Sequence, residues 1–355
     1  MKKIFTHVET EPKIYSFTLK TKITDILFVK AKINNRSDEQ NFMFDTGAPL
    51  TYKFTTKDSF NIQAKKLFRL GPYKTDFGSG SINLGNVKFN NAGFLVTDQI
   101  LGEYKEVEGI IGASMLQTSI CEINFADSTI KISNDINNFK NIENCYSSVF
   151  EPLGSQGTPI VKIVVGKDTA NAFIDTGYSG IIRLNDKINI PSEEAEKQEM
   201  FSSKKDIFTY YQLHRLDISG IKMDTVILGQ DKKYGGYNCI GLTFLKKFIV
   251  TIDWIHHRIY FKPIKAILPK QILYTYGFTC LMKNNQLRVY AIYKDSPAEK
   301  AGLKIGDVIV SINQTNNFSD STISNINAWK LSNDSIRLEI KDKPTITLKK
   351  YKLFN

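Results

Sequence analysis

Two stretches of the chain decide the fold: Phe42-Met43-Phe44-Asp45-Thr46-Gly47-Ala48 and, further on, Ala172-Phe173-Ile174-Asp175-Thr176-Gly177-Tyr178. In each, an aspartate directly follows apolar residues, which predicts a carboxyl group at the end of a buried strand, where ionisation is costly. The Thr hydroxyl can hydrogen-bond a partner loop, and the Gly lets another backbone approach closely or adopts a positive φ. A single Asp-Thr-Gly is more often an ordinary turn than a functional site, but its repetition favours a functional site.

The surroundings of the two aspartates repeat in register. The segment Gly109-Ile110-Ile111-Gly112 ends 67 residues after Asp45, and Cys239-Ile240-Gly241 ends 66 residues after Asp175. Eleven residues beyond each glycine, a strand-like segment begins at Ile123 and at Ile252. The sequence therefore predicts an internal duplication over residues 11–264 with a period near 130 residues.

This combination resembles the retropepsin and pepsin aspartic peptidases, over roughly the first three quarters of the chain. The resemblance implies an all-β-dominated fold with two retropepsin-like lobes related by a pseudo-two-fold axis, each supplying one aspartate to a shared cleft. It makes Asp45 and Asp175 the catalytic residues. The expected supporting residues are those of the two loops and of the two hydrophobic-hydrophobic-Gly elements, namely Thr46, Gly47, Thr176, Gly177, Ile110, Ile111, Gly112, Cys239, Ile240 and Gly241.

The chemistry expected of this pair follows from placing two carboxylates face to face. At ~3 Å, two like charges in a poorly solvated cleft do not both ionise easily, so one pKa rises and the pair holds a single proton. The ionised member takes a proton from a water, and the other donates to the scissile carbonyl oxygen. This mechanism needs no metal, cofactor or covalent intermediate.

The residue after each Asp-Thr-Gly bears on the working pH. Many acid-working relatives carry Ser or Thr there, whose hydroxyl favours the charged carboxylate, whereas this chain has Ala48 and Tyr178. We therefore predict higher apparent pKa values of the dyad and activity extending toward neutral pH, unless Ser179 compensates.

A flap over the cleft is expected in the first lobe. Residues 62–70 and 77–84 flank Gly71-Pro72-Tyr73-Lys74 and predict a β-hairpin with Tyr73 as the candidate tip. An ordinary surface hairpin is the alternative, because Gly78-Ser79-Gly80 could equally form the mobile part. In the second lobe, the charged stretch 192–205 predicts a solvated loop or short helix ahead of a strand over 208–218.

The last part of the chain forms a different unit. Ser296-Pro297-Ala298-Glu299-Lys300-Ala301-Gly302 has an N-cap Ser, Pro at its first position and Gly at its end, and a strand follows at Val308–Asn313. The run resembles the centre of a PDZ domain, a small α+β unit, with Tyr276-Gly277-Phe278 in place of its carboxylate-binding loop. The resemblance implies capture of peptide C-termini. A purely structural cap is the alternative, since a second helix near residues 324–331 is brief and poorly patterned.

These patterns give a division of the chain into an N-terminal tail (1–10), a first peptidase lobe (11–132), a linker (133–150), a second lobe (151–264) and a PDZ-like domain (265–355). The length of 355 residues exceeds what one core usually holds. The two lobes predict a monomer with an internal pseudo-dimer, and an obligate homodimer is disfavoured because one chain carries both aspartates.

Composition excludes several other classes. The net charge is +11, but the lysines are spread rather than clustered, which favours a solvated surface over a nucleic-acid platform. The sequence contains no stretch of ~18 apolar residues, so it predicts no membrane span. The start, Met1-Lys2-Lys3-Ile4-Phe5, begins like a signal peptide but is soon interrupted by polar residues, so export remains open.

The cysteines and histidines do not predict a metal site. The four cysteines lack a C-x-x-C pair, and the histidines are either isolated or adjacent in the sequence.

The sequence thus predicts an aspartic endopeptidase that acts on peptides or proteins, organised in bacterial style with a C-terminal PDZ-like domain. The competing hypothesis is a pseudo-peptidase or PDZ adaptor that holds peptides without cutting them. A decayed site would most simply lose one aspartate, and both are present.

Overall fold

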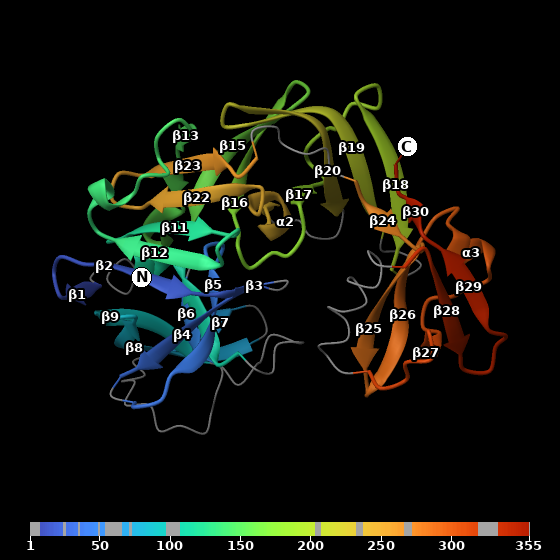
Figure 1. Cartoon of the computed structure of the whole chain (residues 1–355), viewed down its shortest axis with the longest axis horizontal. Coiled ribbons are helices and arrows are strands. Elements are labelled where there is room, and N and C mark those ends of the chain that lie inside the picture. The colour runs from blue at the N-terminus through green and yellow to red at the C-terminus, as the bar shows by residue number, and fades with distance from the viewer. Residues whose placement is uncertain are drawn as a thin grey trace.

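The computed structural model describes residues 8–23, 26–34, 36–48, 50–53, 66–70, 73–96, 107–202, 207–231, 237–265, 272–318 and 333–354. Within these ranges the chain is mostly β. Its helices there are short, namely α1 (Ala113–Leu116), α2 (Leu242–Leu245) and α3 (Pro297–Lys300), with 3-10 turns at Ile136–Asn138 and Gly154–Gln156. Figure 1 shows two β-rich lobes, with a C-terminal unit beside the second lobe. Among the described residues, no helix is long and apolar enough to cross a membrane.

The first lobe is a nine-stranded sheet. Its strands are β1 (Glu9–Glu11), β3 (Lys22–Ile23), β4 (Leu27–Ile33), β5 (Gln40–Asp45), β6 (Thr51–Lys53), β7 (Lys66–Leu70), β8 (Tyr73–Leu84), β9 (Val87–Val96) and β10 (Gly109–Gly112). Strand β4 alternates buried and more exposed residues, as a strand with one face on a core should. By contrast, β10, which lies between β5 and β6, is buried throughout, so both of its faces are covered.

The second lobe and the C-terminal unit share one thirteen-stranded sheet. The lobe contributes β14 (Glu151–Pro152), β15 (Pro159–Val165), β16 (Asp168–Ile174), β17 (Ile182–Asn185), β18 (Ala195–Phe201), β19 (Ile207–Ile218), β20 (Ile221–Asp231) and β21 (Asn238–Ile240). The C-terminal unit contributes β25 (Phe278–Lys283), β26 (Gln286–Tyr293), β27 (Val308–Ile312), β28 (Ser335–Ile340) and β29 (Ile346–Lys349). A separate pair, β24 (Tyr274–Thr275) with β30 (Tyr351–Lys352), ties the two ends of that unit together.

A six-stranded sheet joins the two lobes, in the order β13-β23-β22-β11-β12-β2. Its strands are β2 (Ser16–Lys20), β11 (Ile120–Asn124), β12 (Thr129–Ser133), β13 (Tyr146–Val149), β22 (Phe248–Asp253) and β23 (Arg258–Pro263). The central pair, β11 with β22, has a register that obeys a two-fold axis. Ile120 pairs with Asp253, while Asn124 pairs with Ile249, and Glu122 faces Thr251 in the middle. The duplication in the sequence therefore appears as pseudo-two-fold symmetry.

One apolar core runs through both lobes and the sheet between them, from Leu27 and Phe44 to Phe244 and Trp254. The C-terminal unit has its own core around Phe278. Each core contains residues that alternate along strands with exposed ones, so burial of the apolar faces accounts for the assembly of the sheets.

Three segments expected to be irregular contain strands instead. The tail 1–10 includes the start of β1, which pairs with β9, and the linker 133–150 contains β13, which pairs with β23. The charged stretch 192–205 contains β18, which hydrogen-bonds to β19 on one side and to β26 on the other. Their polar side chains face solvent, so the tertiary partners rather than an apolar pattern fix these strands.

Candidate active site

The two aspartates lie at equivalent ends of buried strands. Asp45 is the last residue of β5, and it pairs with Gly112 of the parallel strand β10. In the second lobe β16 ends at Ile174, whose partner on the parallel strand β21 is Ile240. The Asp175 N–H then donates to the Ile240 carbonyl at 3.0 Å. Each carboxyl group is therefore held at a strand end by a neighbouring strand.

The two aspartate loops are joined by reciprocal hydrogen bonds between their threonines. The Thr46 hydroxyl donates to the Ile174 carbonyl at 2.6 Å, and the Thr176 hydroxyl donates to the Phe44 carbonyl at 2.7 Å. Each hydroxyl also accepts from the other threonine's backbone N–H, at 3.0 and 3.2 Å. Both threonines are fully buried. Each hydroxyl thus satisfies one donor and one acceptor role, and the two loops form one rigid unit.

The glycines of these loops allow the two carboxyl groups to meet. A Cβ atom built on Gly47 would lie 2.4 Å from Cγ of Asp175, and one on Gly177 would lie 2.2 Å from Oδ2 of Asp45. Any side chain at either position would therefore occupy the space of the opposite aspartate. The two carboxyl groups share a side-chain hydrogen bond.

The glycine of each hydrophobic-hydrophobic-Gly element packs on the loop that follows the aspartate. A Cβ atom on Gly112 would lie 2.1 Å from the Leu50 carbonyl oxygen. The equivalent atom on Gly241 would lie 2.4 Å from the Gly180 carbonyl oxygen. Next to these glycines, the Ala113 N–H donates to the Ala48 carbonyl at 2.8 Å and the Leu242 N–H donates to the Tyr178 carbonyl at 2.7 Å. Each hydrophobic-hydrophobic-Gly element therefore packs against the aspartate loop of its own lobe and hydrogen-bonds to it.

The electrostatics of the pair favour one shared proton. Burial and the neighbouring Asp175 charge raise the pKa of Asp45 to about 8, although backbone N–H groups of Ala48 and Gly47 donate to Oδ1 at 2.9 Å. Burial also raises the pKa of Asp175, but the Gly177 N–H, the Asp45 hydroxyl and the charge of Arg183 oppose the rise. Burial and mutual repulsion therefore favour one proton shared by the two carboxyl groups, and the charge of Arg183 favours the ionised form of Asp175.

Arg183 is a residue of this site that the sequence pattern did not single out. It lies on β17 between the buried residues Ile182 and Leu184, so its side chain is on the opposite face of the sheet. Its guanidinium carbon lies 5.0 Å from the ring centre of Tyr178. The residue in register in the first lobe is Tyr52, since Arg183 pairs with Cys239 as Tyr52 pairs with Ile110. A single cation in an otherwise apolar strand was the available signal.

The hairpin expected as a flap is formed by β7 and β8. Tyr73 is the first residue of β8 and pairs with Leu70, while residues 71 and 72 at the turn lie outside the described residues. The stretch Gly78-Ser79-Gly80, the alternative candidate for the mobile part, lies inside β8 and pairs with β9.

The loop expected to bind carboxylates leads into the edge of the C-terminal unit. Gly277 has φ of +97°, and a Cβ atom there would lie 2.5 Å from Cβ of Ser296. Tyr276 is buried with its hydroxyl donating to the Asn333 carbonyl at 2.7 Å, and Phe278 begins β25. Ser296 caps α3 by accepting from the Glu299 N–H, as the sequence predicts. The expected second helix near 324–331 lies outside the described residues.

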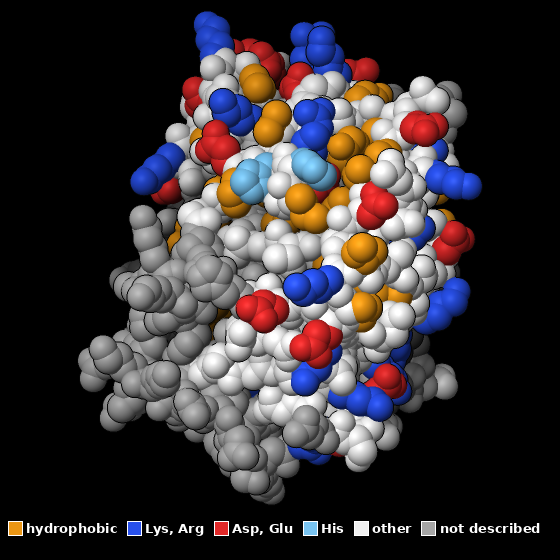
Figure 2. Space-filling model, turned by 90° about the vertical axis from the view of Figure 1, so that its left-hand side faces the viewer, with side chains coloured by type: hydrophobic (Ala, Val, Ile, Leu, Met, Phe, Trp, Pro, Cys, Tyr) orange, Lys and Arg blue, Asp and Glu red, His pale blue; other side chains and the backbone are white. Residues whose placement is uncertain are grey.

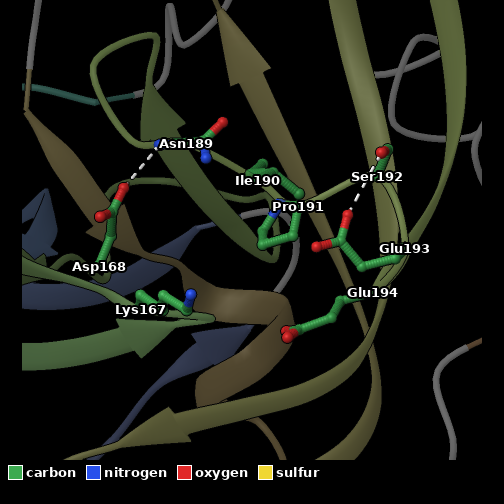
Figure 3. Close-up of a pocket in the computed structure, with 8 residues that line it drawn as sticks. All are labelled: Lys167, Asp168, Asn189, Ile190, Pro191, Ser192, Glu193 and Glu194. Carbon is green, nitrogen blue, oxygen red and sulfur yellow. Dashed lines mark hydrogen bonds between the residues drawn. The ribbon is translucent and has the colours of Figure 1, made fainter.

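Features away from the aspartates do not build a competing site. A surface cavity of about 500 Å³ is lined by Lys167, Asp168 and the loop 189–194 (Figure 3), at the end of β16 opposite Asp175. On the face seen in Figure 2, basic and acidic side chains are interspersed rather than gathered in one basic patch. Among the described residues there is no cluster of three or more potential metal ligands. Cys239 is a buried free thiol.

Comparisons with known proteins show two kinds of similarity, one to a family model and one to solved structures. Residues 288–329 match the family model of the PDZ domain. Among the solved structures that match is the crystal structure of an aspartic proteinase from Irpex lacteus, with a TM-score of 0.47 and 11% sequence identity, over 70% of this chain and 97% of that one. No curated protein matches the sequence.

Proposed function

We propose that this chain is an aspartic endopeptidase whose catalytic dyad is Asp45 and Asp175, with a PDZ domain that binds peptides. The observation that carries the proposal is the mutual insertion of the two loops: each aspartate occupies the space beside the other loop's glycine, and the threonine bonds fix that approach. This geometry keeps the two carboxyl groups close together. Because two carboxylates at such a distance repel each other, the pair retains one shared proton.

The roles of the two aspartates follow from their surroundings. Asp175, with the positive charge of Arg183 nearby, is the better candidate for the ionised base that takes a proton from the attacking water. Asp45, with its pKa raised to about 8, is the better candidate for the acid that donates to the carbonyl oxygen of the scissile peptide bond. Breakdown of the tetrahedral intermediate then returns a proton to the leaving amine.

Hydrolysis of a mixed peptide library tests this function. The wild type is expected to cleave internal peptide bonds between about pH 5 and 7.5, whereas Asp45→Asn and Asp175→Asn should each lose at least about 10³-fold in kcat. Asp224→Asn is the matched control, because Asp224 is exposed on β20. Peptide binding without cleavage by the wild type would favour the non-catalytic adaptor.

A second experiment addresses the PDZ domain. Peptides with a free C-terminal carboxylate are expected to bind the full chain more tightly than the same peptides with an amidated C-terminus, because backbone N–H groups of the loop at Tyr276-Gly277-Phe278 would contact the carboxylate. Equal affinity for the two forms would favour a structural cap instead. Fluorescence polarisation on the Asp45→Asn variant measures binding without hydrolysis.

A further inference from the structure

The PDZ domain is built onto the second lobe by backbone pairing. Met200 and Phe201 of β18 pair with Tyr293 and Ile292 of β26, so the sheet continues from the lobe into the domain. Beyond the strands, the Lys294 N–H donates to the Glu199 carbonyl at 3.0 Å. Figure 1 places β18 alongside the upper ends of the PDZ strands. The connection is therefore a continuous sheet rather than a loose tether.

An apolar cluster, here called the junction cluster, fills the space beside this pairing. Its buried members come from the second lobe, from β26 and from the C-terminal end of the chain: Met200, Ile227, Ala291, Tyr293, Leu353 and Phe354. Ile181, Phe208 and Tyr210 of the second lobe pack against it. Ile181 belongs to the loop that follows Asp175, and its carbonyl accepts from the Gly241 N–H at 2.7 Å. The junction cluster therefore touches the catalytic loop directly.

Two buried tyrosines connect the PDZ domain to the same region. The Tyr210 and Tyr293 rings lie 5.7 Å apart with an interplanar angle of 30°, and their hydroxyl groups are hydrogen-bonded to each other. Tyr293 also bonds the PDZ loop, because its N–H donates to the Gly277 carbonyl at 2.9 Å. Tyr293 thus stands between the loop proposed to bind carboxylates and the second lobe.

Tyr210 lies in the same row of the sheet as Arg183. Both residues pair with Gly229, Tyr210 across β19 and β20 and Arg183 across β17 and β20, so their side chains share one face. Tyr178 lies against Arg183 on that face and is close enough to Tyr210 for the two hydroxyl groups to interact electrostatically. Tyr210 therefore connects Tyr293 to the face of the sheet that carries Arg183 and Tyr178, which lie beside Asp175.

We propose that Tyr293 of the PDZ domain is a positioning residue for the catalytic loop, acting through Tyr210 and the junction cluster to hold Tyr178 and Arg183 beside Asp175. The inference rests on the proposed function for its kinetic consequence, but the positioning itself is a property of the structure. The hydroxyl of Tyr293 fixes the place of Tyr210, and the packing on Ile181 fixes the loop.

The groups that face Asp175 decide what loss of this support does. They are Asp45 from the first lobe, Arg183 on β17, Cys239 on β21 and Tyr178 in the loop itself. Burial raises the pKa of the Cys239 thiol to about 12 and also raises the pKa of Tyr178, so neither is charged at neutral pH. Arg183 is the one of these four that carries a positive charge. If Arg183 moves away, ionisation of Asp175 becomes harder.

The test is Tyr293→Phe, which keeps the ring and removes the hydroxyl. We expect kcat at pH 6 to fall about tenfold, the equivalent of ~1.4 kcal/mol in activation free energy, with KM changed by less than about twofold. The acid limb of the pH profile should move to higher pH. Carbon-13 NMR titration of aspartate carboxyls in the full chain should show the same upward displacement of the dyad, whether or not peptide is cleaved.

Two control variants separate positioning from general loss of packing. Tyr351→Phe removes a buried hydroxyl that has no hydrogen-bond partner among the described residues, although its ring packs against the same cluster. Tyr15→Phe removes a buried hydroxyl that is 2.7 Å from the Ser119 hydroxyl, just before the strands β2 and β11 of the sheet between the lobes. Both should keep the wild-type profile. Should Tyr293→Phe fail to fold, Tyr210→Phe removes the other partner of the same bond.

The outcomes are distinct. A Tyr293→Phe variant that is less stable but has unchanged kcat and an unchanged carboxyl titration would overturn the inference and leave the proposed function standing. A wild type that cleaves no peptide would overturn the proposed function, and a displaced titration in Tyr293→Phe would still support the positioning.

Discussion

The two aspartates have the same neighbours in sequence but different neighbours in space. Asp45 accepts backbone hydrogen bonds from Gly47 and Ala48, whereas Asp175 accepts from Gly177 and has Arg183 nearby. The repeat was enough to predict that the two carboxyl groups meet. It was not enough to predict their different surroundings, because Arg183 reaches the site through strand pairing that no local pattern encodes.

One consequence of the raised pKa is a pH-dependent stability. The pKa of Asp45 in the folded chain, about 8, lies above its unfolded value, so the stability associated with its protonated form is fully present below about pH 4 and is lost as the pH rises through about 8. Asp45→Asn removes this loss of stability at higher pH, because the amide side chain does not ionise. We expect Asp45→Asn to gain at least about 1.4 kcal/mol relative to wild type between pH 4.5 and pH 8, measured by urea unfolding.

The control for this experiment is Asp224→Asn, which changes an exposed carboxylate on the same chain. Its difference from wild type should stay flat over the same range. A difference for Asp45→Asn that is equally flat would contradict the buried, proton-sharing state of the pair.

The residue after the first Asp-Thr-Gly offers a test of the working pH. Ala48 is buried and supplies only its backbone N–H to Asp45. A hydroxyl at this position would add a hydrogen bond to the charged carboxylate, which is worth ~1.5–3 kcal/mol. We expect Ala48→Ser to move the alkaline limb of kcat about one pH unit toward acid, as measured by a pH-rate profile. Ala48→Gly, without the hydroxyl, should leave the limb in place.

At the scale of elements, the threonine bonds are the joint between the two aspartate loops. Thr176→Val leaves the Phe44 carbonyl and the Thr46 N–H without their partner. Because both groups are buried, we expect a loss of ~2–4 kcal/mol in the free energy of unfolding, together with loss of activity. Thr176→Ser keeps the hydroxyl and should cost ~1 kcal/mol for the missing methyl group. Equal losses for Val and Ser would show that the hydroxyl is not what joins the loops.

Two glycines allow the effect of a steric contact on stability to be compared with the effect of a positive φ. Gly112 has φ of −97°, which any residue adopts, so the objection to a side chain there is its 2.1 Å approach to the Leu50 carbonyl. Gly154 has φ of +49° but open space around it. We expect Gly112→Ala to lose about 2–3 kcal/mol and Gly154→Ala about 1 kcal/mol in urea unfolding. The reverse order would mean that the loop moves aside easily.

Much of the element pattern could be predicted from the sequence. The strands that carry the aspartates have apolar runs, and the N-cap Ser296 with Pro297 marks the start of α3. The strands β13 and β18 could not be predicted in this way. Both are edge or bridging strands without a regular apolar alternation, so the backbone of a distant partner is what fixes them as strands.

At the scale of the whole molecule, the two-fold relation lies inside a single chain. Both carboxyl groups, both threonines and both supporting glycines come from one polypeptide. We therefore expect the specific activity to stay constant on dilution over about three orders of magnitude in concentration, and gel filtration to place the active species at monomer mass. An enzyme that needed two chains would lose activity on dilution as the chains dissociate.

The attachment of the PDZ domain is the part of the architecture that the sequence predicted least. Its presence followed from the run around Ser296 and Gly302, but its continuity with the second lobe depends on β18 and on the buried C-terminal residues Leu353 and Phe354. Those residues lie about 150 positions apart in the chain and share no pattern. Such a contact is visible only in three dimensions.

The pairing of β11 with β22 also bears on when the two halves of the chain can come together during synthesis. A ribosome-bound chain that has emerged only as far as residue 240 already displays both aspartates, yet it lacks the partner of the first half's central strand. We expect such a nascent chain to be harmless to its own synthesis machinery. The order in which residues leave the exit tunnel would then serve as a safeguard that needs no separate inhibitor.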